Sequence, residues 1–247
     1  MSAKRHARSF GRWLAAGVGV AAGAYAATAA IAWYRYGKVN RRPGETDRDA
    51  LLDTFMPEYD IVERHRIQVR ASATVTFRAA AEIDVEASPI IRAIFRTREL
   101  VMRAHPTRPR APQGLLSAMR TIGWGVLAEI PGREIVMGAV TQPWKADVVF
   151  RPLPPAEFAA FAEPGFVKIV WTLRADPVDE STSIFRTETR AIPTDSLSRA
   201  RFRRYWSFVS PGIVAIRWLL LRPVKRHAER RGDVAAAGQT AQNRQNA

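Results

Sequence analysis

The chain has 247 residues, of which 47% are hydrophobic, and it carries a formal net charge of +15 at neutral pH. It contains no cysteine, which excludes disulfide bonds, thiolate catalysis and cysteine-ligated zinc. After the first 44 residues, about 200 remain, which suits a single domain with a full hydrophobic core.

The positive charge is concentrated in two parts of the sequence. Residues 1–44 hold eight Lys or Arg and no acid, and residues 199–231 hold ten, with Glu229 as the one acid. Between them, residues 45–198 carry 19 basic and 21 acidic side chains. A nucleic-acid-binding domain needs its basic patch on the folded body, so this distribution argues against nucleic acid as a partner. Basic segments next to a membrane span instead attract anionic head groups.

Residues 13–34 are an uncharged run that begins at Trp13 and ends at Trp33 and Tyr34. As a helix with a rise of ~1.5 Å per residue, the run reaches about 33 Å, enough to cross a hydrocarbon core of ~30 Å. We therefore expect a transmembrane anchor, preceded by a basic N-terminus over residues 1–12. The alternative is a cleaved signal peptide, for which Ala24-Tyr25-Ala26 fits the cleavage pattern, although the run is longer than a usual signal peptide core.

The surroundings of the anchor leave its orientation and assembly open. Four basic residues precede the run and four follow it, so the positive-inside rule does not decide the side of the membrane. Gly19 and Gly23 have the spacing of a helix-packing motif, which would allow a homodimer through the anchor. Residues 35–56 are mostly polar and are expected to form a linker.

The next segments show one strand pattern and two helix starts. Residues 59–70 alternate with period two and predict a half-buried strand. Ser72 is a candidate N-cap for a helix over residues 73–82, and Ser88-Pro89 opens a second helix. The proline-rich residues 104–113 predict an extended loop.

Two hairpins and a short helix are predicted in the middle of the chain. The first hairpin spans residues 121–141 around the turn Pro131-Gly132, and the second spans residues 166–192 around DPVDES. A short helical piece, AEFAAFAE, lies between them. Alternation in the first hairpin places Ile122, Trp124, Val126, Ala128 and Ile130 on one face. In the second hairpin, Arg186, Glu188 and Arg190 are expected on a solvated face.

A long C-terminal helix is predicted from Asp195-Ser196. Residues 196–230 combine an apolar stripe with many arginines, and Pro211-Gly212 should kink the helix. We expect the stripe to pack onto the sheet and the arginines to face water or anionic lipid, among them Arg201, Arg203, Arg204 and Arg217. A contact with the anionic leaflet would weakly favour a cytoplasmic domain. Residues 232–247 are rich in Ala and Gln and are expected to form a disordered tail.

The order of strand, two helices, antiparallel hairpins and a long C-terminal helix resembles the START-like (SRPBCC) superfamily. This superfamily includes birch-pollen-allergen-like proteins, polyketide cyclases and lipid-transfer proteins, and the chain looks like its membrane-anchored bacterial members. The matching stretches are PEYDIVERHRIQV, SPIIRAIF, LAEIPGREIVMG, FAEPGFVKIVWTL, TETR and RFRRYWSFVSPG. The resemblance implies an α+β helix-grip fold over residues 57–231, in which a curved antiparallel sheet wraps around the long helix. It says little about activity, because this fold hosts binding, transfer and cyclase chemistry.

Six residues are candidates for a ligand-binding site. Glu63 and His65 share the inward face of the first strand, where they could orient a ligand or act as acid and base. The alternative is that His65 is a hydrogen-bonded histidine near the frayed end of the strand. Trp124 and Trp171 also face inward, as core or as ligand-stacking groups, and Thr187 and Thr189 border the same expected cavity. No metal-ligand spacing or nucleotide-binding motif occurs, so we expect neither metal nor cofactor.

Three functions remain open from the sequence. The leading hypothesis is a membrane-tethered domain whose apolar cavity binds a lipid or another hydrophobic small molecule. The second is a cyclase- or dehydratase-type enzyme that uses Glu63 and His65, or Thr187 and Thr189, in the same cavity. The third is a structural or partner-binding module with a collapsed pocket.

Overall fold

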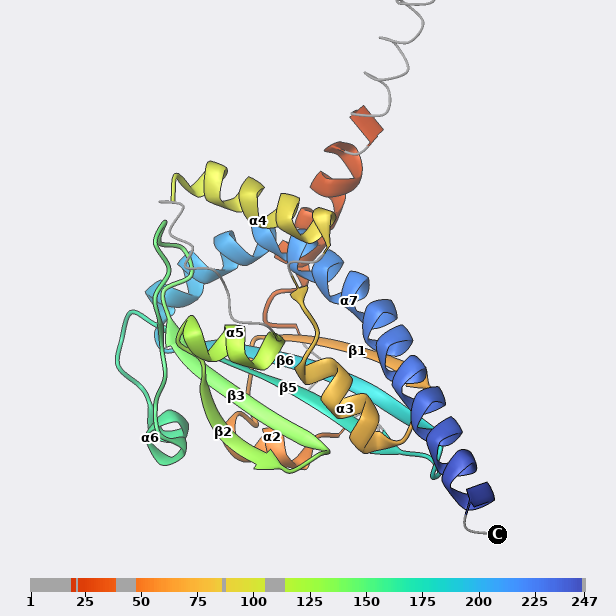
Figure 1. The fold of residues 1–247 in the computed structure, drawn as a ribbon. Coiled ribbons are helices and arrows are strands. Elements are labelled where there is room, and N and C mark those ends of the chain that lie inside the picture. Colours follow the sequence, from red (N-terminus) through yellow and green to blue (C-terminus); the bar gives the residue numbers. More distant parts are fainter. Residues whose placement is uncertain (1–18, 21, 39–47, 86–87, 105–113, 246–247) are drawn as a thin grey trace, which may run out of the picture.

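The structure is a computed structural model that describes residues 19–20, 22–38, 48–85, 88–104 and 114–245. It is an α+β fold in which an antiparallel sheet packs on a long C-terminal helix (Figure 1). The helices are α2 (Ala50–Phe55), α3 (Ala73–Ala81), α4 (Pro89–Met102), α5 (Leu115–Thr121), α6 (Pro155–Ala160) and α7 (Ser196–Gln245). The strands are β1 (Ile61–Val69), β2 (Gly125–Ile130), β3 (Glu134–Thr141), β4 (Phe150–Arg151), β5 (Val167–Pro177) and β6 (Ser183–Pro193).

The six strands follow the order β1-β6-β5-β3-β2, with the short β4 also paired to β3. Both predicted hairpins are present, as β2–β3 and β5–β6, and the predicted first strand is β1 at the edge next to β6. The first and last strands of the chain are therefore neighbours, and the sheet packs on α3 and α7. We call the face that packs on these helices the inner face, and the opposite face, which carries α2 and α6, the outer face.

Local sequence signals explain where the helices begin. Ser72 and Ser88 accept hydrogen bonds from the backbone N–H groups of Val75 and Ile91, so both predicted N-caps are confirmed. Asp195 caps α7, because its carboxylate accepts from the Ser198 backbone N–H at 2.9 Å and from the Ser198 hydroxyl at 2.6 Å.

The first hairpin differs from its predicted pattern. The register of β2 against β3 shifts between Val126 and Ala128, which is a β-bulge. A bulge adds one residue to one strand and reverses which residues face inward after it. As a result Trp124 and Val126 pack into the inner core, whereas Leu127 and Ala128 pack on the outer face, and the single shared face that we predicted for this strand is wrong.

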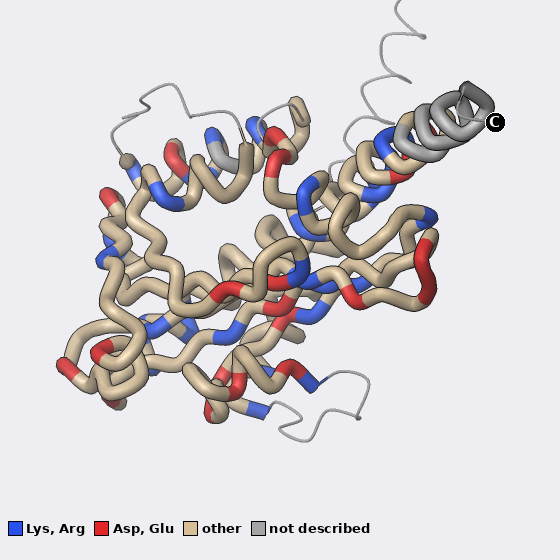
Figure 2. Tube along the Cα trace, turned by 60° about the horizontal axis from the view of Figure 1, so that its bottom comes forward, with Lys and Arg blue, Asp and Glu red and all other residues tan. Residues whose placement is uncertain are grey.

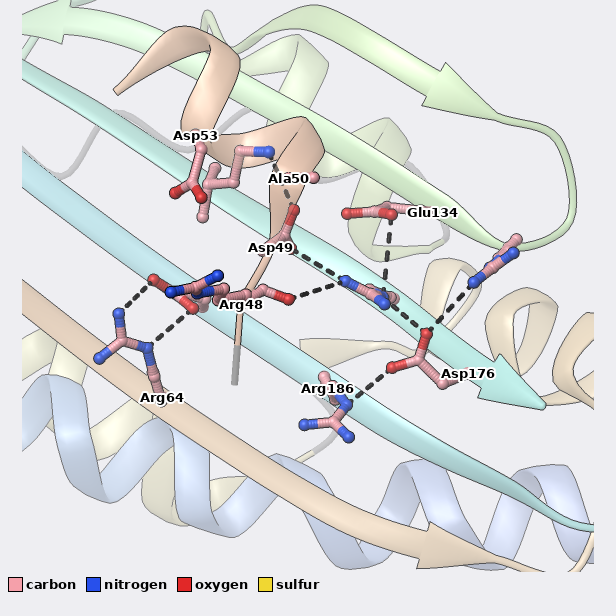
Figure 3. A network of polar contacts seen from close by, with 12 residues as sticks. Arg48, Asp49, Ala50, Asp53, Arg64, Glu134, Asp176 and Arg186 are labelled. Carbon is pink, nitrogen blue, oxygen red and sulfur yellow. Dashed lines mark hydrogen bonds and ion pairs between the residues drawn. The ribbon is translucent and has the colours of Figure 1, made fainter. Parts of the chain in front are cut away.

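The outer face is also less exposed than the alternation suggested. Arg190 is fully buried, and Glu188 is 6% exposed, because α2 lies across this part of the sheet. Figure 2 shows acidic and basic residues next to one another on the central strands. The expected solvated face of β6 is therefore a buried ionic layer (Figure 3), and α2 forms part of what we expected to be a linker over residues 35–56.

Helix α7 runs without interruption from Ser196 to Gln245 and contains Pro211 and Pro223. It changes direction along its length, so that its first part crosses near α4 and the remainder runs beside β1 and α3 (Figure 1). The helix covers residues 232–245, which we expected to be a disordered tail. Ala, Gln and Arg are good helix formers, and no proline follows Pro223, so the local sequence supports continuation.

Residues 22–35 are helical and lie against the first part of α7. Tyr25 packs edge-on against Phe208, and the Arg203 guanidinium donates to the Trp33 carbonyl at 3.1 Å and lies over the Trp33 ring. Arg203 thus contacts this helix. Much of the start of the expected anchor, including residues 13–18, lies outside the described residues, so the membrane span stays a prediction. Among the residues that the structure describes, Ser196–Val234 is the one helical segment long and apolar enough to cross a membrane, a property shared by long core helices.

Candidate functional site

Five polar side chains meet on the inner face between two apolar clusters. They come from three elements: Glu63 and His65 from β1, Thr187 and Thr189 from β6, and Arg217 from α7. We call this group the inner polar cluster. On one side lies a core of Phe77, Met137, Leu173, Phe185 and Leu221 among others, and on the other side lies a smaller cluster that includes Ile61, Phe202 and Trp206. A polar group in this position interrupts what is otherwise a continuous hydrophobic core.

The strand register brings four members of the cluster together. Glu63 is opposite Thr189, and His65 is opposite Thr187, in the antiparallel pairing of β1 with β6. Directly opposed residues on one sheet face have Cβ atoms about 4.5–5.5 Å apart, so these side chains are neighbours. Trp171 is opposite Thr189 on the next strand, so the indole borders the cluster.

Arg217 reaches the cluster from the helix. Its guanidinium donates to the Thr187 hydroxyl at 3.3 Å and also to the Thr189 hydroxyl, while its buried Nε has no partner among the residues that the structure describes. Our prediction that Arg217 faces water or lipid is therefore wrong. Burial lowers the pKa of Arg217 to about 10, an effect that the nearby Glu63 opposes, so the guanidinium is cationic at neutral pH.

His65 is 7% exposed, and within the described residues neither of its ring nitrogens has a hydrogen-bond partner. Burial, and then the charge of Arg217, lower the pKa of His65 to about 4, so the imidazole is neutral at pH 7. Its Nε2 lies 3.9 Å from Glu63 Oε2, too long for a hydrogen bond. Burial raises the pKa of Glu63, against the opposing charges of Arg217 and Arg35. The alternative interpretation placed His65 near the frayed end of the strand, whereas His65 lies in the middle of β1.

The two predicted tryptophans contact each other on the inner face. The Trp124 and Trp171 rings are T-shaped with centroids 6.0 Å apart, and Trp124 also stacks on Phe150 at 5.0 Å. Trp124 therefore joins the site through Trp171, and both rings also belong to or pack against the hydrophobic core. All six residues predicted from the sequence lie on this face, four of them in the inner polar cluster.

Arg217 was the member of the cluster that the sequence interpretation missed, although the sequence holds a signal for it. The residues of α7 that pack inward include Ile213, Leu221, Val224 and Ala228, at helical spacing. Arg217 is four residues from both Ile213 and Leu221, so it occupies the apolar stripe rather than the charged face. A charged residue at a position of the apolar stripe is therefore expected to face the core rather than solvent.

The cluster combines hydrogen-bond donors and acceptors of several kinds. It presents one cationic guanidinium, one neutral imidazole that can donate and accept, two hydroxyls and one carboxyl group. This set can hold an oxygen-bearing group such as a carboxylate or carbonyl. Within the described part of the chain, no three His, Asp or Glu side chains are placed to hold a metal ion.

The apolar cavity that we expected beneath α7 is not where the described pocket lies. A pocket of about 190 Å³ is lined mainly by residues of the outer face, including Arg64, Thr172, Arg174 and Arg186. On the inner side, the apolar side chains form the two clusters described above. The polar pocket on the outer face therefore does not correspond to the apolar cavity that we expected beneath α7.

No protein-family model matches this chain, and no curated protein matches it in sequence. Among solved structures, it is similar to the Zhui aromatase/cyclase from Streptomyces sp. R1128, with 11% identity over 69% of this chain and 94% of that chain and a TM-score of 0.25. It is also similar to norcoclaurine synthase from Thalictrum flavum in complex with dopamine and hydroxybenzaldehyde, with 10% identity over 75% of this chain and 94% of that chain and a TM-score of 0.25. A third match is the di-domain ARO/CYC protein BexL, with 14% identity over 68% of this chain and 46% of that chain and a TM-score of 0.23. These scores are too low to support a functional conclusion.

Proposed function

We propose that this protein is a membrane-tethered binding domain for a hydrophobic small molecule that carries an oxygen-bearing polar end. One observation carries the proposal: Arg217 Nε and both ring nitrogens of His65 are buried at the boundary between two apolar clusters and have no hydrogen-bond partner in the part of the chain that the structure describes. Buried polar groups in folded proteins nearly always have a hydrogen-bond partner, so a missing partner indicates a place for a ligand atom or a water.

The chemistry of the cluster favours an anionic or strongly polar oxygen. A guanidinium in an apolar environment makes its strongest hydrogen bonds to a carboxylate or a similar oxyanion. The apolar clusters on both sides provide the surface for a hydrocarbon or aromatic body. The ligand class is therefore an amphipathic molecule, such as a fatty acid or an aromatic acid.

Trp218 provides a route from solvent to the cluster. Its indole is 61% exposed and packs edge-on against His65, with ring centroids 5.4 Å apart. The cluster is thus separated from solvent at this point by one exposed side chain. Rotation of this side chain would open a path without unfolding the sheet.

The tether itself rests on residues 13–34. We propose that this segment stays attached and places the domain at a membrane surface, with weak preference for the cytoplasmic side. The spacing of Gly19 and Gly23 also fits a homodimer through the anchor. N-terminal sequencing of the protein from cells tests attachment. A mature N-terminus at or after Ala27 would show that the segment is cleaved.

Ligand binding is tested on the full chain after gentle detergent extraction. Native mass spectrometry should detect a bound hydrophobic molecule, and cis-parinaric acid, a fluorescent C18 carboxylic acid, should bind the delipidated protein. Because hydrogen bonds to charged groups contribute about 1.5–3 kcal/mol, Arg217→Gln should weaken this binding about 10- to 150-fold. Arg201→Gln removes an exposed charge of the same helix and serves as the control. If Arg217→Gln binds cis-parinaric acid as tightly as Arg201→Gln does, and circular dichroism shows that both variants are folded, the proposal is refuted.

A second candidate is an enzyme of the cyclase or dehydratase type at the same cluster. It is favoured by a neutral imidazole 3.9 Å from a carboxyl group whose pKa burial raises, because such a pair can exchange a proton with a substrate. If a bound molecule is chemically converted by the wild-type protein, the double variant Glu63→Gln with His65→Gln should abolish that conversion. Undiminished conversion in the double variant would eliminate this candidate.

A further inference from the structure

The outer face holds a second polar site, which the proposed function does not use. The pocket of about 190 Å³ is far larger than the ~10–15 Å³ that a single enclosed water needs. Its lining contains five arginines and two acids, Asp49 and Glu188, together with Thr172. The arginines are Arg48, Arg64, Arg66, Arg174 and Arg186. His65 and Thr187 also border the pocket, but their side chains make the inner-face contacts described above.

The strand register explains why so many arginines lie together. Arg66 is opposite Arg186, and Arg186 is opposite Arg174, so three neighbouring strands present a transverse row of three guanidinium groups. Strands lie about 4.8 Å apart, and like charges directly opposite one another are unfavourable. This arrangement therefore needs negative charge close by.

The carboxylates near the row are shared among several arginines. Asp176 accepts from Arg174 at 2.6 Å and from Arg186 at 2.7 Å, and it is 3.6 Å from Arg133 (Figure 3). Glu188 is likewise divided between Arg64, at 2.9 and 3.0 Å, and Arg190, at 2.7 Å. Each of these carboxylates thus serves at least two guanidinium groups, and among the described residues that line the pocket the arginines outnumber the acids.

Arg174 shows how the acids are positioned around the pocket. Besides Asp176, it lies 3.9 Å from Glu134 and 4.0 Å from Asp49, and it donates to the Arg48 carbonyl (Figure 3). Burial, and then the adjacent Asp49, raise the pKa of Glu134 to about 8, so Glu134 supplies little negative charge at neutral pH.

Thr172 supplies a separate observation. Its side chain lines the pocket and the residue is 1% exposed, yet its hydroxyl has no hydrogen-bond partner in the described part of the chain. It is opposite Glu188 in the strand register and two residues from Arg174 on the same face of β5. A buried hydroxyl that borders a cationic pocket is placed to donate to a bound anion.

We propose that this pocket binds a phosphate group, with Arg48, Arg174 and Thr172 among its donors. Several guanidinium groups around one pocket match the several terminal oxygens of a phosphate, and arginine is well suited to phosphate recognition. The phosphate could come from a free phosphate or from the head group of a phosphatidic acid. The site lies on the opposite face of the sheet from the inner polar cluster and does not depend on its proposed function.

The test is isothermal titration calorimetry of the full chain in non-ionic detergent with sodium phosphate, against sodium chloride at equal ionic strength. Phosphate should bind with a heat that chloride does not produce. Thr172→Val and Arg48→Gln should each weaken phosphate binding at least fivefold, whereas Arg201→Gln, on exposed α7 surface, should change it less than twofold. A wild-type protein that binds phosphate no better than chloride would overturn the proposal, as would unchanged affinity in both pocket variants.

Two further measurements sharpen the result. Thr172→Val removes an unpartnered hydroxyl, so its melting temperature without phosphate should equal or exceed that of the wild type; a large decrease would indicate a purely structural role and overturn the assignment of Thr172. Dihexanoyl phosphatidic acid distinguishes the source. If dihexanoyl phosphatidic acid binds at least tenfold more tightly than inorganic phosphate, the natural ligand is a lipid head group. If the two bind with equal affinity, the natural ligand is a free phosphate.

Discussion

Glu188 is the residue whose removal should most clearly expose the energetics of the buried ionic layer. Its side chain on β6 is 7% exposed and accepts from Arg64 Nε and Nη2 and from Arg190 Nε. Arg190 is completely buried and also donates to Asp53 and to the Met56 carbonyl. Glu188→Gln keeps the shape of the side chain but removes the charge that neutralises two guanidinium groups.

The expected cost follows from the burial of the pair. Breaking a buried ion pair by removing one partner costs about 3–5 kcal/mol, because the remaining charge is left uncompensated. A glutamine still accepts one hydrogen bond, and Asp53 still faces Arg190, so we expect the lower end, about 3 kcal/mol. For a domain of this size, about 2–4 °C of melting temperature corresponds to each kcal/mol, which gives a decrease of about 6–12 °C.

Urea denaturation followed by circular dichroism, in buffer without phosphate, measures the free energy of unfolding. The matched control is Glu163→Gln, which breaks an exposed pair with Arg151 of 3.0 Å and should cost no more than about 1 kcal/mol. If Glu188→Gln costs less than 1 kcal/mol, or no more than the control, then solvent screens this layer and our description of it as buried is incorrect.

Three further predictions concern other parts of the molecule. Gly123→Ala should destabilise the fold by about 3 kcal/mol or more, because the residue has a φ of +104° and an added Cβ would overlap the Phe150 carbonyl oxygen. Gly165→Ala, with a similar φ of +95° but only an ordinary van der Waals contact of 3.6 Å with Gln142 Nε2, should cost about 1–2 kcal/mol in the same denaturation experiment. Because the pKa of Glu134 is raised from 4.5 to about 8, the folded chain holds a proton that the unfolded chain has lost in this range, so stability should fall as pH rises from about 4.5 to about 8. Glu134→Gln should flatten that fall in melting curves at pH 5, 6.5 and 8; an unchanged slope would disprove the assignment. Finally, a chain of residues 45–247 should bind anionic vesicles in a salt-dependent manner, and the joint change Arg201→Gln and Arg204→Gln should weaken it. Absence of binding at low salt would show that the exposed arginines of α7 serve solubility alone.

The local elements of the fold could be predicted from the sequence because each has a local physical cause. The period-two pattern of residues 59–70 gave β1, and the dipeptide Pro131-Gly132 gave the turn between β2 and β3, where Gly132 has a φ of +71°. Ser72 and Ser88 marked two helix starts through hydrogen bonds to residues three positions ahead. In each of these cases the determining contacts lie within a few residues.

The errors arose where a distant element determines the outcome. The alternation of Arg186, Glu188 and Arg190 is what a solvated strand face shows, and only the position of α2 across the outer face makes it buried. The bulge in β2 reverses the direction of Ala128 without any glycine or proline at the point of change. Helix α5 was missed because it follows the proline-rich segment and presents no capping side chain; its N-cap is Gly114.

The candidate site was recovered in part for a related reason. Glu63, His65, Thr187 and Thr189 each depart from the apolar pattern of the inner face, and Arg217 departs from the apolar stripe of α7. One departure of this kind is a tolerated polar residue, since an isolated side chain can often reach solvent or a backbone group. Here, polar residues on three elements lie together in the fold. Each of them increases the desolvation cost of the others. Arg217 satisfies the two threonines but leaves its own Nε and both nitrogens of His65 without partners. Selection for stability alone would replace such a group with apolar side chains of similar volume. Its presence between two apolar clusters therefore motivates the proposal that a ligand atom or a water supplies hydrogen bonds there.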